Sequence, residues 1–553
     1  MCDKKVLGTL VQLFLAFVVA LSSTTALIPL LMRWGPALGF TDPPGPRKLH
    51  ATPVPRIGGL AMAVGILLPA LLTVPLTAPV RGTLLGLIVL LAFGLWDDRT
   101  TLGYRAKFLG QIIAVVLCMI VGGIRVGDVS IGGVTPLHGT ASAVVTFVFL
   151  LGITNAVNLT DGLDGLAGGM ALLCLCAIAL FAYTAGNLSI TTLCLIEAGA
   201  VLGFLRFNTH PARIFMGDSG SQVLGFTVGA LALLATQSDD SNLSAALPLL
   251  LLGLPILDTA TVMVTRTRAG RSPFLADNSH LHHRLLALGF AHREAVATLY
   301  LLQVGLVLAA YFLRFESDLE VVLTFCGFAA LVLGLLSWAA HSSWRVREAG
   351  QVGTIHAGVR ALVASPRLPQ WALIVMISCL VVYAVTVIAS SRRVGIDVGV
   401  LSLIMLIVLL LGIWRTNRML EWFERTAAYV SVVLLVYLDQ TSTGKAPLLT
   451  EASWSLIWIT AGAAFVRFWL SPTRRFEVTA LDLIVIFLAV VMPNLPGSIA
   501  LPADLPGGII KAVILLYVVE MLLTVDLKRA MPRVLLGLTL AVIAGRAFLG
   551  FPA

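Results

Sequence analysis

Long apolar runs, separated by short polar segments, follow one another along nearly the whole chain. Most runs hold about 17 to 25 residues, the length that an α-helix needs to cross a hydrocarbon core roughly 30 Å thick. The pattern therefore predicts an all-α fold, a polytopic transmembrane helical bundle. The expected spans of the first part are 8–32, 57–78, 82–96, 108–124, 139–157, 165–185, 188–205, 215–235, 243–264, 295–313 and 320–340.

The same alternation continues beyond residue 370 and predicts about seven more helices. They are expected at 371–389, 397–414, 429–441, 454–470, 479–493, 509–525 and 534–550. We therefore divide the chain into a first transmembrane domain over 1–340, a cytoplasmic linker over 341–370 and a C-terminal transmembrane extension over 371–553.

The basic residues predict an orientation for the bundle. Lys and Arg concentrate in the loops 33–56, 97–107, 206–214 and 265–294, and few lie in the loops of the opposite face. Cytoplasmic loops of membrane proteins carry an excess of Lys and Arg. We expect these four loops, together with 158–164, to face the cytoplasm.

The composition agrees with a membrane protein, since 58% of the 553 residues are hydrophobic and 12% are charged, against roughly 25% charged residues in soluble proteins. The net charge of +9 comes mainly from the short loops, so it indicates membrane topology and no nucleic-acid partner. The seven cysteines lie mostly in apolar segments without CxxC spacing, and we expect free, buried thiols.

Polar side chains gather in four of the loops assigned to the cytoplasmic face. These loops read GLWDDRTTLGYRAK, NAVNLTDGLDGLAGG, FNTHPARIFMGDSGS and SPFLADNSHLHHRLL. Any one of them could be an ordinary solvated turn, since Asp and Gly are common turn formers. The opposite loops hold few carboxylates, and this asymmetry favours one shared site. The residues singled out are Asp97, Asp98, Lys107, Asn158, Asp161, Asp164, Asn208, Phe215, Asp218, His280, His282, His283 and Arg284.

Clustered carboxylates beside Lys, Arg and His suit a phosphate-rich substrate bridged by a hard cation. We expect Mg²⁺, with Mn²⁺ as an alternative. Zinc on His280, His282 and His283 is the competing interpretation, but neighbours in HLHH cannot all face one tetrahedral centre from a helix, and no Cys accompanies them. The chain has no P-loop and no convincing GxGxxG motif, so an ATP-driven pump finds no support.

Five motifs together resemble the polyprenyl-phosphate N-acetylhexosamine-1-phosphate transferases, glycosyltransferase family 4. They are PVPRIGG at 53–59, the Asp97–Asp98 pair, NLTDGLDG, the GDSGS segment around Asp218, and HLHHRL, in the family's order over roughly residues 1–340.

Two features look like the branch that transfers GlcNAc-1-phosphate to undecaprenyl phosphate. They are MGDSGSQVLGF and the long segment from PILDTAT to HLHHRLL, whereas NLTDGLDG looks like the phospho-MurNAc-pentapeptide transferases of peptidoglycan synthesis. We give the first branch more weight because the loop after the ninth predicted helix is thought to shape sugar selectivity in this family.

The resemblance implies a multi-pass enzyme of the bacterial inner membrane, with its site facing the cytoplasm. A phosphate oxygen of undecaprenyl phosphate would attack the β-phosphorus of a UDP-N-acetylhexosamine and release UMP, initiating a cell-envelope glycan such as the O-antigen of lipopolysaccharide. The family likeness also allows a homodimer.

The resemblance also implies roles for individual residues. Asp218 is expected to bind Mg²⁺ directly, with Asp98 as a second ligand and Asp97 as the base for the acceptor phosphate. Diphosphate binding and charge stabilisation as UMP leaves are expected from His280, His282, His283 and Arg284. The nucleotide site is expected to involve Lys48, Lys107, Asn158, Asp161, Asp164, Asn208 and Phe215.

Three alternatives stay open at this point. Asp97 acts either as a base or as a nucleophile that forms a covalent phospho-enzyme.

The extension 371–553 does not match the family, so a scaffold, a lipid-handling module and a stabilising annex are equally open. Lys511, Glu520 and Arg546 are candidates for intramembrane charges there. A secondary transporter would place its polar residues near the bilayer midplane in both halves, whereas here they gather at one face of one half.

Overall fold

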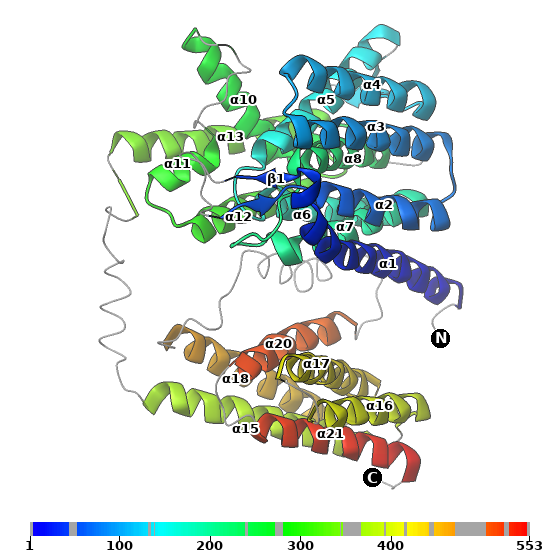
Figure 1. Ribbon diagram of the computed structural model, residues 1–553, viewed down its shortest axis with the longest axis vertical. Helices are drawn as coiled ribbons and strands as arrows, with labels where there is room; N and C mark the ends of the chain where they lie inside the picture. Colours follow the sequence, from blue (N-terminus) through cyan, green and yellow to red (C-terminus); the bar gives the residue numbers. More distant parts are fainter. Residues whose placement is uncertain are drawn as a thin grey trace. The chain divides into compact units, whose positions relative to one another are not determined.

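The computed structural model of the chain describes residues 4–43, 52–130, 134–137, 139–237, 242–270, 272, 280–342, 344–346, 367–391, 394–413, 417–441, 447–470, 505–524 and 530–549. They form two compact units, one made of the described residues up to 346 and the other of those from 367 onward. Each unit is a bundle of helices (Figure 1). The prediction of an all-α helical bundle is therefore confirmed.

The first unit holds the helices α1 to α13. Their bounds are α1 Lys4–Trp34, α2 Gly58–Thr73, α3 Ala78–Thr100, α4 Tyr104–Gly122, α5 Gly139–Thr160, α6 Leu166–Thr184, α7 Leu188–Asn208, α8 Gly217–Thr236, α9 Leu247–Leu251, α10 Gly253–Arg268, α11 Leu281–Ala287, α12 His292–Phe312 and α13 Asp318–His341. A short 3-10 helix, η1, covers Pro36–Leu38. The predicted spans coincide with these helices within a few residues, except for one break.

The break divides the predicted span 243–264 into α9 and α10. Pro255 has no backbone N–H, so it cannot donate to the carbonyl of Leu251 four residues earlier. That carbonyl instead accepts from Gln303 Nε2 at 2.7 Å and from Cys174 Sγ at 2.8 Å. Side chains of α12 and α6 thus satisfy the backbone group that the proline leaves without its helical partner.

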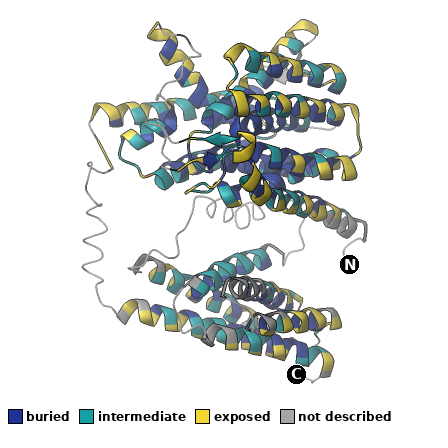
Figure 2. Cartoon of the chain, viewed as in Figure 1, coloured by how far each residue is buried: buried dark blue, intermediate teal, exposed yellow. Residues whose placement is uncertain are grey.

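Helix α8 is the most enclosed element of the site region, and nearly all of its residues are buried. It packs against α2, α3, α5, α6 and α7, and it lies among the dark blue ribbons of Figure 2. Small residues allow this close packing. A Cβ at Gly94 would overlap the backbone of Ser219, so glycine is needed where α3 crosses α8.

Eleven of the described helices are long and apolar enough to cross a membrane. In the first unit they are α1 (from Gln12), α3, α4, α5, α6, α7, α8, α12 and α13. In the second unit they are α15 Arg367–Ser390 (from Gln370) and α18 Pro447–Leu470 (from Leu449 to Arg467). The chain is therefore a multi-pass membrane protein.

Two short antiparallel sheets accompany the helices of the first unit. β1 (Thr41–Asp42) pairs with β2 (Val54–Pro55), and β3 (Asp128–Ser130) pairs with β4 (Val134–Pro136). A bridge between Arg56 and Phe215 extends the end of β2 toward the start of α8. This extension matters for the site described below.

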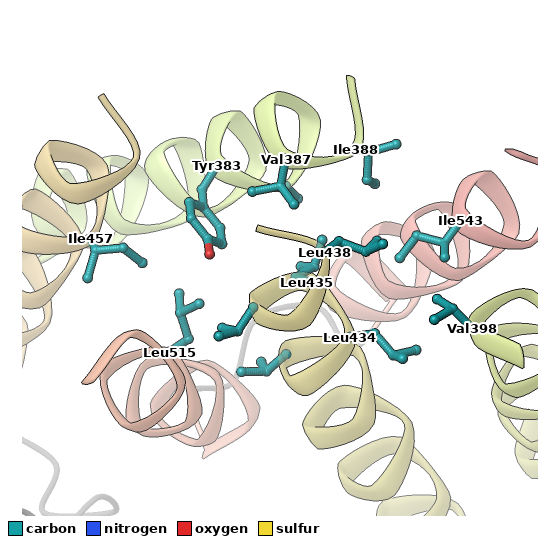
Figure 3. Packing of buried hydrophobic residues seen from close by; sticks show 13 residues of the cluster. Tyr383, Val387, Ile388, Val398, Leu434, Leu435, Leu438, Ile457, Leu515 and Ile543 are labelled. Atoms are coloured by element: carbon teal, nitrogen blue, oxygen red, sulfur yellow. The ribbon is translucent and has the colours of Figure 1, made fainter. Parts of the chain in front are cut away.

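The second unit consists of α15 Arg367–Ser390, α16 Ile396–Ile413, α17 Asn417–Thr441, α18 Pro447–Leu470, α20 Leu505–Thr524 and α21 Ala530–Leu549. The expected span 479–493 lies outside the described residues. Figure 3 shows apolar side chains of α15, α17, α18, α20 and α21 turned toward one another, among them Tyr383, Leu435, Ile457 and Leu515. This core gives the second unit its own hydrophobic centre.

A buried ion pair lies beside that core. Lys511 Nζ of α20 is 2.6 Å from Asp439 Oδ2 of α17, and each side chain is 4% exposed. The same carboxylate oxygen accepts from Ser453 Oγ at 3.1 Å and from the Tyr383 hydroxyl at 3.2 Å. Lys511 also donates to Ser453 Oγ and lies 4.6 Å from the centre of the Trp454 ring. The predicted intramembrane charge at Lys511 therefore has a complete set of partners.

Candidate active site

Three carboxylates meet where α3 ends and α8 begins. Asp97 and Asp98 belong to the last turn of α3, and Asp218 belongs to the first turn of α8. All three residues are buried or nearly so. One oxygen from each lies within 4.8 Å of the others. The structure thus joins two of the four polar loops of the sequence in a single acidic cluster.

Asp98 caps helix α8 from outside that helix. Its Oδ1 accepts from the Asp218 backbone N–H at 2.8 Å, and its Oδ2 accepts from the Ser219 N–H at 3.0 Å and from Ser219 Oγ at 2.6 Å. A carboxylate satisfies the free N–H groups of a helix start and suits its positive end. Gly217 has φ +73°, and a Cβ there would overlap the Asp98 carboxylate, so glycine is needed for this approach.

Lys107, in the first turn of α4, neutralises the other side of the cluster. Its Nζ lies 2.7 Å from Asp97 Oδ2 and 2.6 Å from Asp218 Oδ2. The remaining oxygen of Asp97 accepts from the Leu102 backbone N–H at 2.6 Å. This bond fixes the Asp97 carboxylate at the turn between α3 and α4, so that it faces Lys107.

Arg56 supplies a second cation. Its Nε lies 3.1 Å from Asp98 Oδ1, and its Nη2 contacts Asp218 Oδ1. The PVPRIGG segment is held to the start of α8 by three backbone hydrogen bonds of 2.9 Å. Phe215 N–H donates to Pro55, Gly58 N–H donates to Phe215, and Gly59 N–H donates to Met216. This ladder of backbone hydrogen bonds positions Arg56 beside Asp98 and Asp218.

The acidic cluster fits a divalent metal of the Mg²⁺ type by its donor chemistry. Mg²⁺ and Mn²⁺ prefer hard oxygen ligands, and three carboxylates offer them here at mutual distances that one ion can bridge. Asp97, Asp98 and Asp218 would hold such an ion.

The DGLDG turn lies beside this cluster. Asn158 accepts a hydrogen bond from Ser221 Oγ of α8, which ties the end of α5 to the same helix. Asp161 is partly buried in this turn. Burial raises the pKa of Asp161 to about 7. Negative charge from Asp218 adds to the rise, and Arg56 opposes it.

His280 is the N-cap residue of the short helix α11, which begins with the other residues of HLHH and packs on the DGLDG turn. A Cβ at Gly162 would overlap the imidazole of His282, so α11 approaches the turn closely. His282 is buried, and burial lowers its pKa to about 3, with a further contribution from His283. The centres of the His280 and His282 rings are 5.6 Å apart, and those of the His282 and His283 rings are 4.3 Å apart.

Asp258 of α10 holds the start of α11. Its Oδ2 lies 2.9 Å from His280 Nδ1, and its Oδ1 accepts from the Leu281 N–H at 2.7 Å. A carboxylate on one ring nitrogen fixes the tautomer and direction of a histidine. Asp258 thus leaves the other nitrogen of His280 as the one available to a ligand.

Asp164 forms a second group of ligand atoms with two histidines. His210 Nδ1 lies 2.7 Å from Asp164 Oδ2, and the rings of His210 and His292 stack with centres 4.1 Å apart. Ligand atoms of Asp164, His210 and His292 also lie within 4.8 Å of one another. Among the described residues, the converging groups of this kind are this one and the acidic cluster, and the three HLHH histidines form neither.

The remaining predicted site residues occupy different kinds of positions. Asn208 is buried, and both ends of its amide bond backbone groups, Gly165 N–H at 2.9 Å and Ile214 C=O at 2.9 Å. It therefore joins the DGLDG turn to the loop before α8. Phe215 and Arg284 are partly exposed. Lys48 lies outside the described residues.

Two residues that the sequence analysis did not select are central to this geometry. Arg56 lies within PVPRIGG, and Asp258 lies within PILDTAT, so both belong to segments already noted for the family resemblance. A charged residue inside a motif was the available signal for each.

The comparisons with known proteins identify the family of the chain. Residues 80–236 match the model of the family described as glycosyl transferase family 4. A Bacillus subtilis (strain 168) protein named "Probable undecaprenyl-phosphate N-acetylglucosaminyl 1-phosphate transferase" is 35% identical over 297 residues, which cover 53% of this chain and 82% of the relative. The chain belongs to glycosyl transferase family 4. The resemblance inferred from the five motifs is confirmed.

Two further relatives of the family carry related names. A Mycolicibacterium smegmatis (strain ATCC 700084 / mc(2)155) protein, named decaprenyl-phosphate N-acetylglucosaminephosphotransferase, is 39% identical over 291 residues, 47% of this chain and 71% of the relative. A Salmonella typhi protein, named undecaprenyl-phosphate alpha-N-acetylglucosaminyl 1-phosphate transferase, is 27% identical over 332 residues, 58% of this chain and 89% of the relative. All three names specify N-acetylglucosamine, as the branch assignment predicted.

Proposed function

We propose that this chain transfers N-acetylglucosamine-1-phosphate from UDP-N-acetylglucosamine to a polyprenyl phosphate and releases UMP. The names of the three relatives support the sugar and the lipid. The observation that carries the proposal is the convergence of three carboxylates with Arg56 and Lys107 at the ends of α3, α4 and α8. Such a cluster suits the phosphates of both substrates.

The reaction requires charge stabilisation more than covalent chemistry. A phosphate oxygen of the lipid attacks the β-phosphorus of the donor, and the bond from that phosphorus to the UMP oxygen breaks. Lys107 and Arg56 supply positive charge to phosphate oxygens, and Asp97 accepts any proton left on the attacking phosphate. We assign binding of the donor diphosphate to His280, His282, His283 and Arg284. A bound Mg²⁺ ion would add charge neutralisation at the acidic cluster.

The cluster's place at helix ends supports an enzyme over a transporter. Asp97 and Asp98 lie in the last turn of α3, Lys107 lies in the first turn of α4, and Asp218 lies in the first turn of α8. A transporter is expected to hold its charged ligand site near the bilayer midplane. A site at the boundary suits a lipid phosphate and a water-soluble nucleotide, since these meet only there. We place it on the cytoplasmic side of the bacterial inner membrane, in agreement with the basic loops.

The test measures transfer of labelled sugar phosphate to undecaprenyl phosphate by the purified full chain. We expect metal-dependent transfer from UDP-GlcNAc and none from UDP-MurNAc-pentapeptide. Asp218→Asn should lose this transfer. Glu316→Gln is its matched control, because Glu316 is an exposed carboxylate in the loop between α12 and α13, and it should keep the wild-type rate. Transfer from the pentapeptide donor alone would assign the chain to peptidoglycan synthesis, and no transfer from either would refute the proposal.

A second measurement separates the two roles of Asp97. If Asp97 were a nucleophile, labelled UMP would exchange into UDP-GlcNAc without any lipid acceptor. Its two oxygens already bond Leu102 and Lys107, which suits a group held in place to accept a proton. We therefore expect no exchange without the lipid, and exchange at the rate of transfer would establish the covalent route.

A further inference from the structure

The oxygen atoms of the acidic cluster that suit a metal also carry the two protein cations. Arg56 bonds Asp98 Oδ1 and Asp218 Oδ1, while Lys107 bonds Asp97 Oδ2 and Asp218 Oδ2. Both oxygens of Asp218 thus have a cationic partner.

Asp98 has no lone pair to spare. A carboxylate offers about four acceptor positions. The Asp218 N–H, the Ser219 N–H, Ser219 Oγ and Arg56 Nε account for four hydrogen bonds and contacts. The first three of these partners belong to the start of α8, which is buried. Arg56 is therefore the partner that Asp98 can most easily release.

The Arg56 side chain is partly exposed, so it can leave the carboxylates without a change of its backbone. Its backbone is held by the ladder to Phe215, but the side chain itself is 30% exposed, whereas that of Asp98 is 0% exposed. A guanidinium released from the carboxylates therefore stays at the rim of the cluster. Arg is well suited to phosphate, because its planar group binds two oxygens at once.

We propose that Arg56 is a positioning residue that competes with the divalent cation for Asp98 and Asp218. When the cation binds, the Arg56 guanidinium leaves these carboxylates and binds a phosphate of the donor. The inference rests on the proposed function for the identity of the phosphate ligand. It predicts that removal of the Arg56 side chain strengthens binding of the divalent cation and weakens binding of the donor phosphate.

The experiment measures Mn²⁺ binding to the purified full chain by electron paramagnetic resonance, without nucleotide. Arg56→Gln removes the competing charge, so Mn²⁺ should bind about 10-fold more tightly than to the wild type. With saturating Mn²⁺, the same variant should bind UDP about 10-fold more weakly. Arg56→Lys keeps the charge but loses the two-pronged contact, so its affinities for Mn²⁺ and for UDP should lie between those of the wild type and of Arg56→Gln.

Arg99→Gln is the matched control. Arg99 follows Asp98 directly, its side chain is exposed, and it lies outside the ion pairs described for the cluster. The substitution removes the same charge from the same region, and Mn²⁺ affinity should change less than about 2-fold because solvent screens exposed charges. An Arg56→Gln variant that binds Mn²⁺ no more tightly than Arg99→Gln overturns the inference, and Arg56→Lys decides in the same way should Arg56→Gln not fold.

Asp218→Asn distinguishes this failure from failure of the proposed function. If Mn²⁺ binding does not depend on Asp218, the metal site is wrong and the inference is overturned with it. If binding depends on Asp218 and tightens in Arg56→Gln while the chain transfers no sugar phosphate, the competition stands and the proposed reaction is wrong.

Discussion

Two charged clusters occupy the two units of this protein, and they differ in balance and exposure. The acidic cluster of the first unit sets three carboxylates against Arg56 and Lys107, whose side chains are each 30% exposed, and its formal charge is −1. The ion pair of the second unit sets Lys511 against Asp439, each 4% exposed, and its formal charge is zero. The first cluster keeps a negative charge that a further cation can balance by displacing Arg56, whereas the second is already neutral.

The difference shows that a charge inside a helical bundle does not by itself indicate a ligand site. Ionisable residues within membrane spans are functional candidates by default. Lys511 meets that description, but its ammonium group is already bound by Asp439 and Ser453 and lies over the Trp454 ring. The ion pair joins α17 to α20, and Ser453 adds α18. We therefore interpret it as a contact that fixes how these three helices pack.

The largest expected effect distinguishes the clusters by activity. Asp218→Asn should lower the rate of sugar phosphate transfer at least about 1000-fold, because it removes one of the three carboxylates that would hold the Mg²⁺ ion and the shared partner of Arg56 and Lys107. Asp439→Asn makes the same chemical change in the other cluster and should keep the rate per folded molecule. Both rates are measured with labelled UDP-GlcNAc. Equal losses in the two variants would contradict the comparison.

The second prediction concerns stability. Lys511→Met leaves the buried Asp439 carboxylate without its cation and should lower the free energy of unfolding of the second unit by about 3 to 5 kcal/mol. Lys511→Met combined with Asp439→Leu removes both charges and should recover most of that loss. Chemical denaturation of the full chain in detergent measures both. A double variant as unstable as the single one would show that the pair itself stabilises the unit.

The third prediction concerns the hold of Asp258 on the HLHH segment. Asp258→Asn weakens the bond to His280, and transfer should fall about 10- to 100-fold, the range expected for a hydrogen bond to a charged group. Asp258→Glu should recover part of the rate.

Asp318→Asn is the control for Asp258. Asp318 is a buried carboxylate that also bonds a side chain and a backbone N–H, Ser244 Oγ and the Ala246 N–H, but at the start of α13. It should lower stability and keep the rate per folded molecule. A similar loss of rate in both variants would assign Asp258 a structural role only.

The smallest expected effect is a pH dependence. The pKa of His282 is lowered to about 3 in the folded protein, against an ordinary value of about 6.5. Between these values the unfolded chain binds a proton that the folded chain excludes, so stability is complete above about pH 6.5 and falls as the pH is lowered. Near pH 5.5 this loss amounts to about 1.4 kcal/mol.

Glutamine does not bind this proton, so His282→Gln should lose less stability than the wild type between pH 7.5 and pH 5.5. The unfolding midpoints of both proteins at the two pH values measure the difference. The remaining histidines are shared by both proteins and cancel. Identical pH dependences would mean that His282 is accessible to protons in the folded state.

Hydrophobic periodicity predicted the helices well, because the length and composition of a span are local properties. The expected span 188–205 became α7 Leu188–Asn208, and 397–414 became α16 Ile396–Ile413. The break between α9 and α10 was missed although Pro255 was visible. Whether a proline ends a helix depends on partners for the free carbonyl, and Gln303 and Cys174 come from distant parts of the chain.

The candidate site was predicted by residue type and not by partner. The sequence indicated that Asp97, Asp98, Lys107 and Asp218 share one face, and the structure brings them together. It did not indicate that Asp98 caps α8 or that both ends of the Asn208 amide bond the backbone. These bonds join residues 43 to 121 positions apart, and their pairing is set by how the helices pack.

The ladder between PVPRIGG and the start of α8 has a consequence for how such enzymes can be recombined. Arg56 and Asp218 are 162 positions apart, yet the segment that contains Arg56 is bonded to the residues that directly precede Asp218. A change that shifts the backbone of one segment therefore displaces the charged side chain that the other segment presents to it. Chimeras between family members should retain function when residues 53–59 and 213–218 come from the same parent, and should lose it when a crossover separates them.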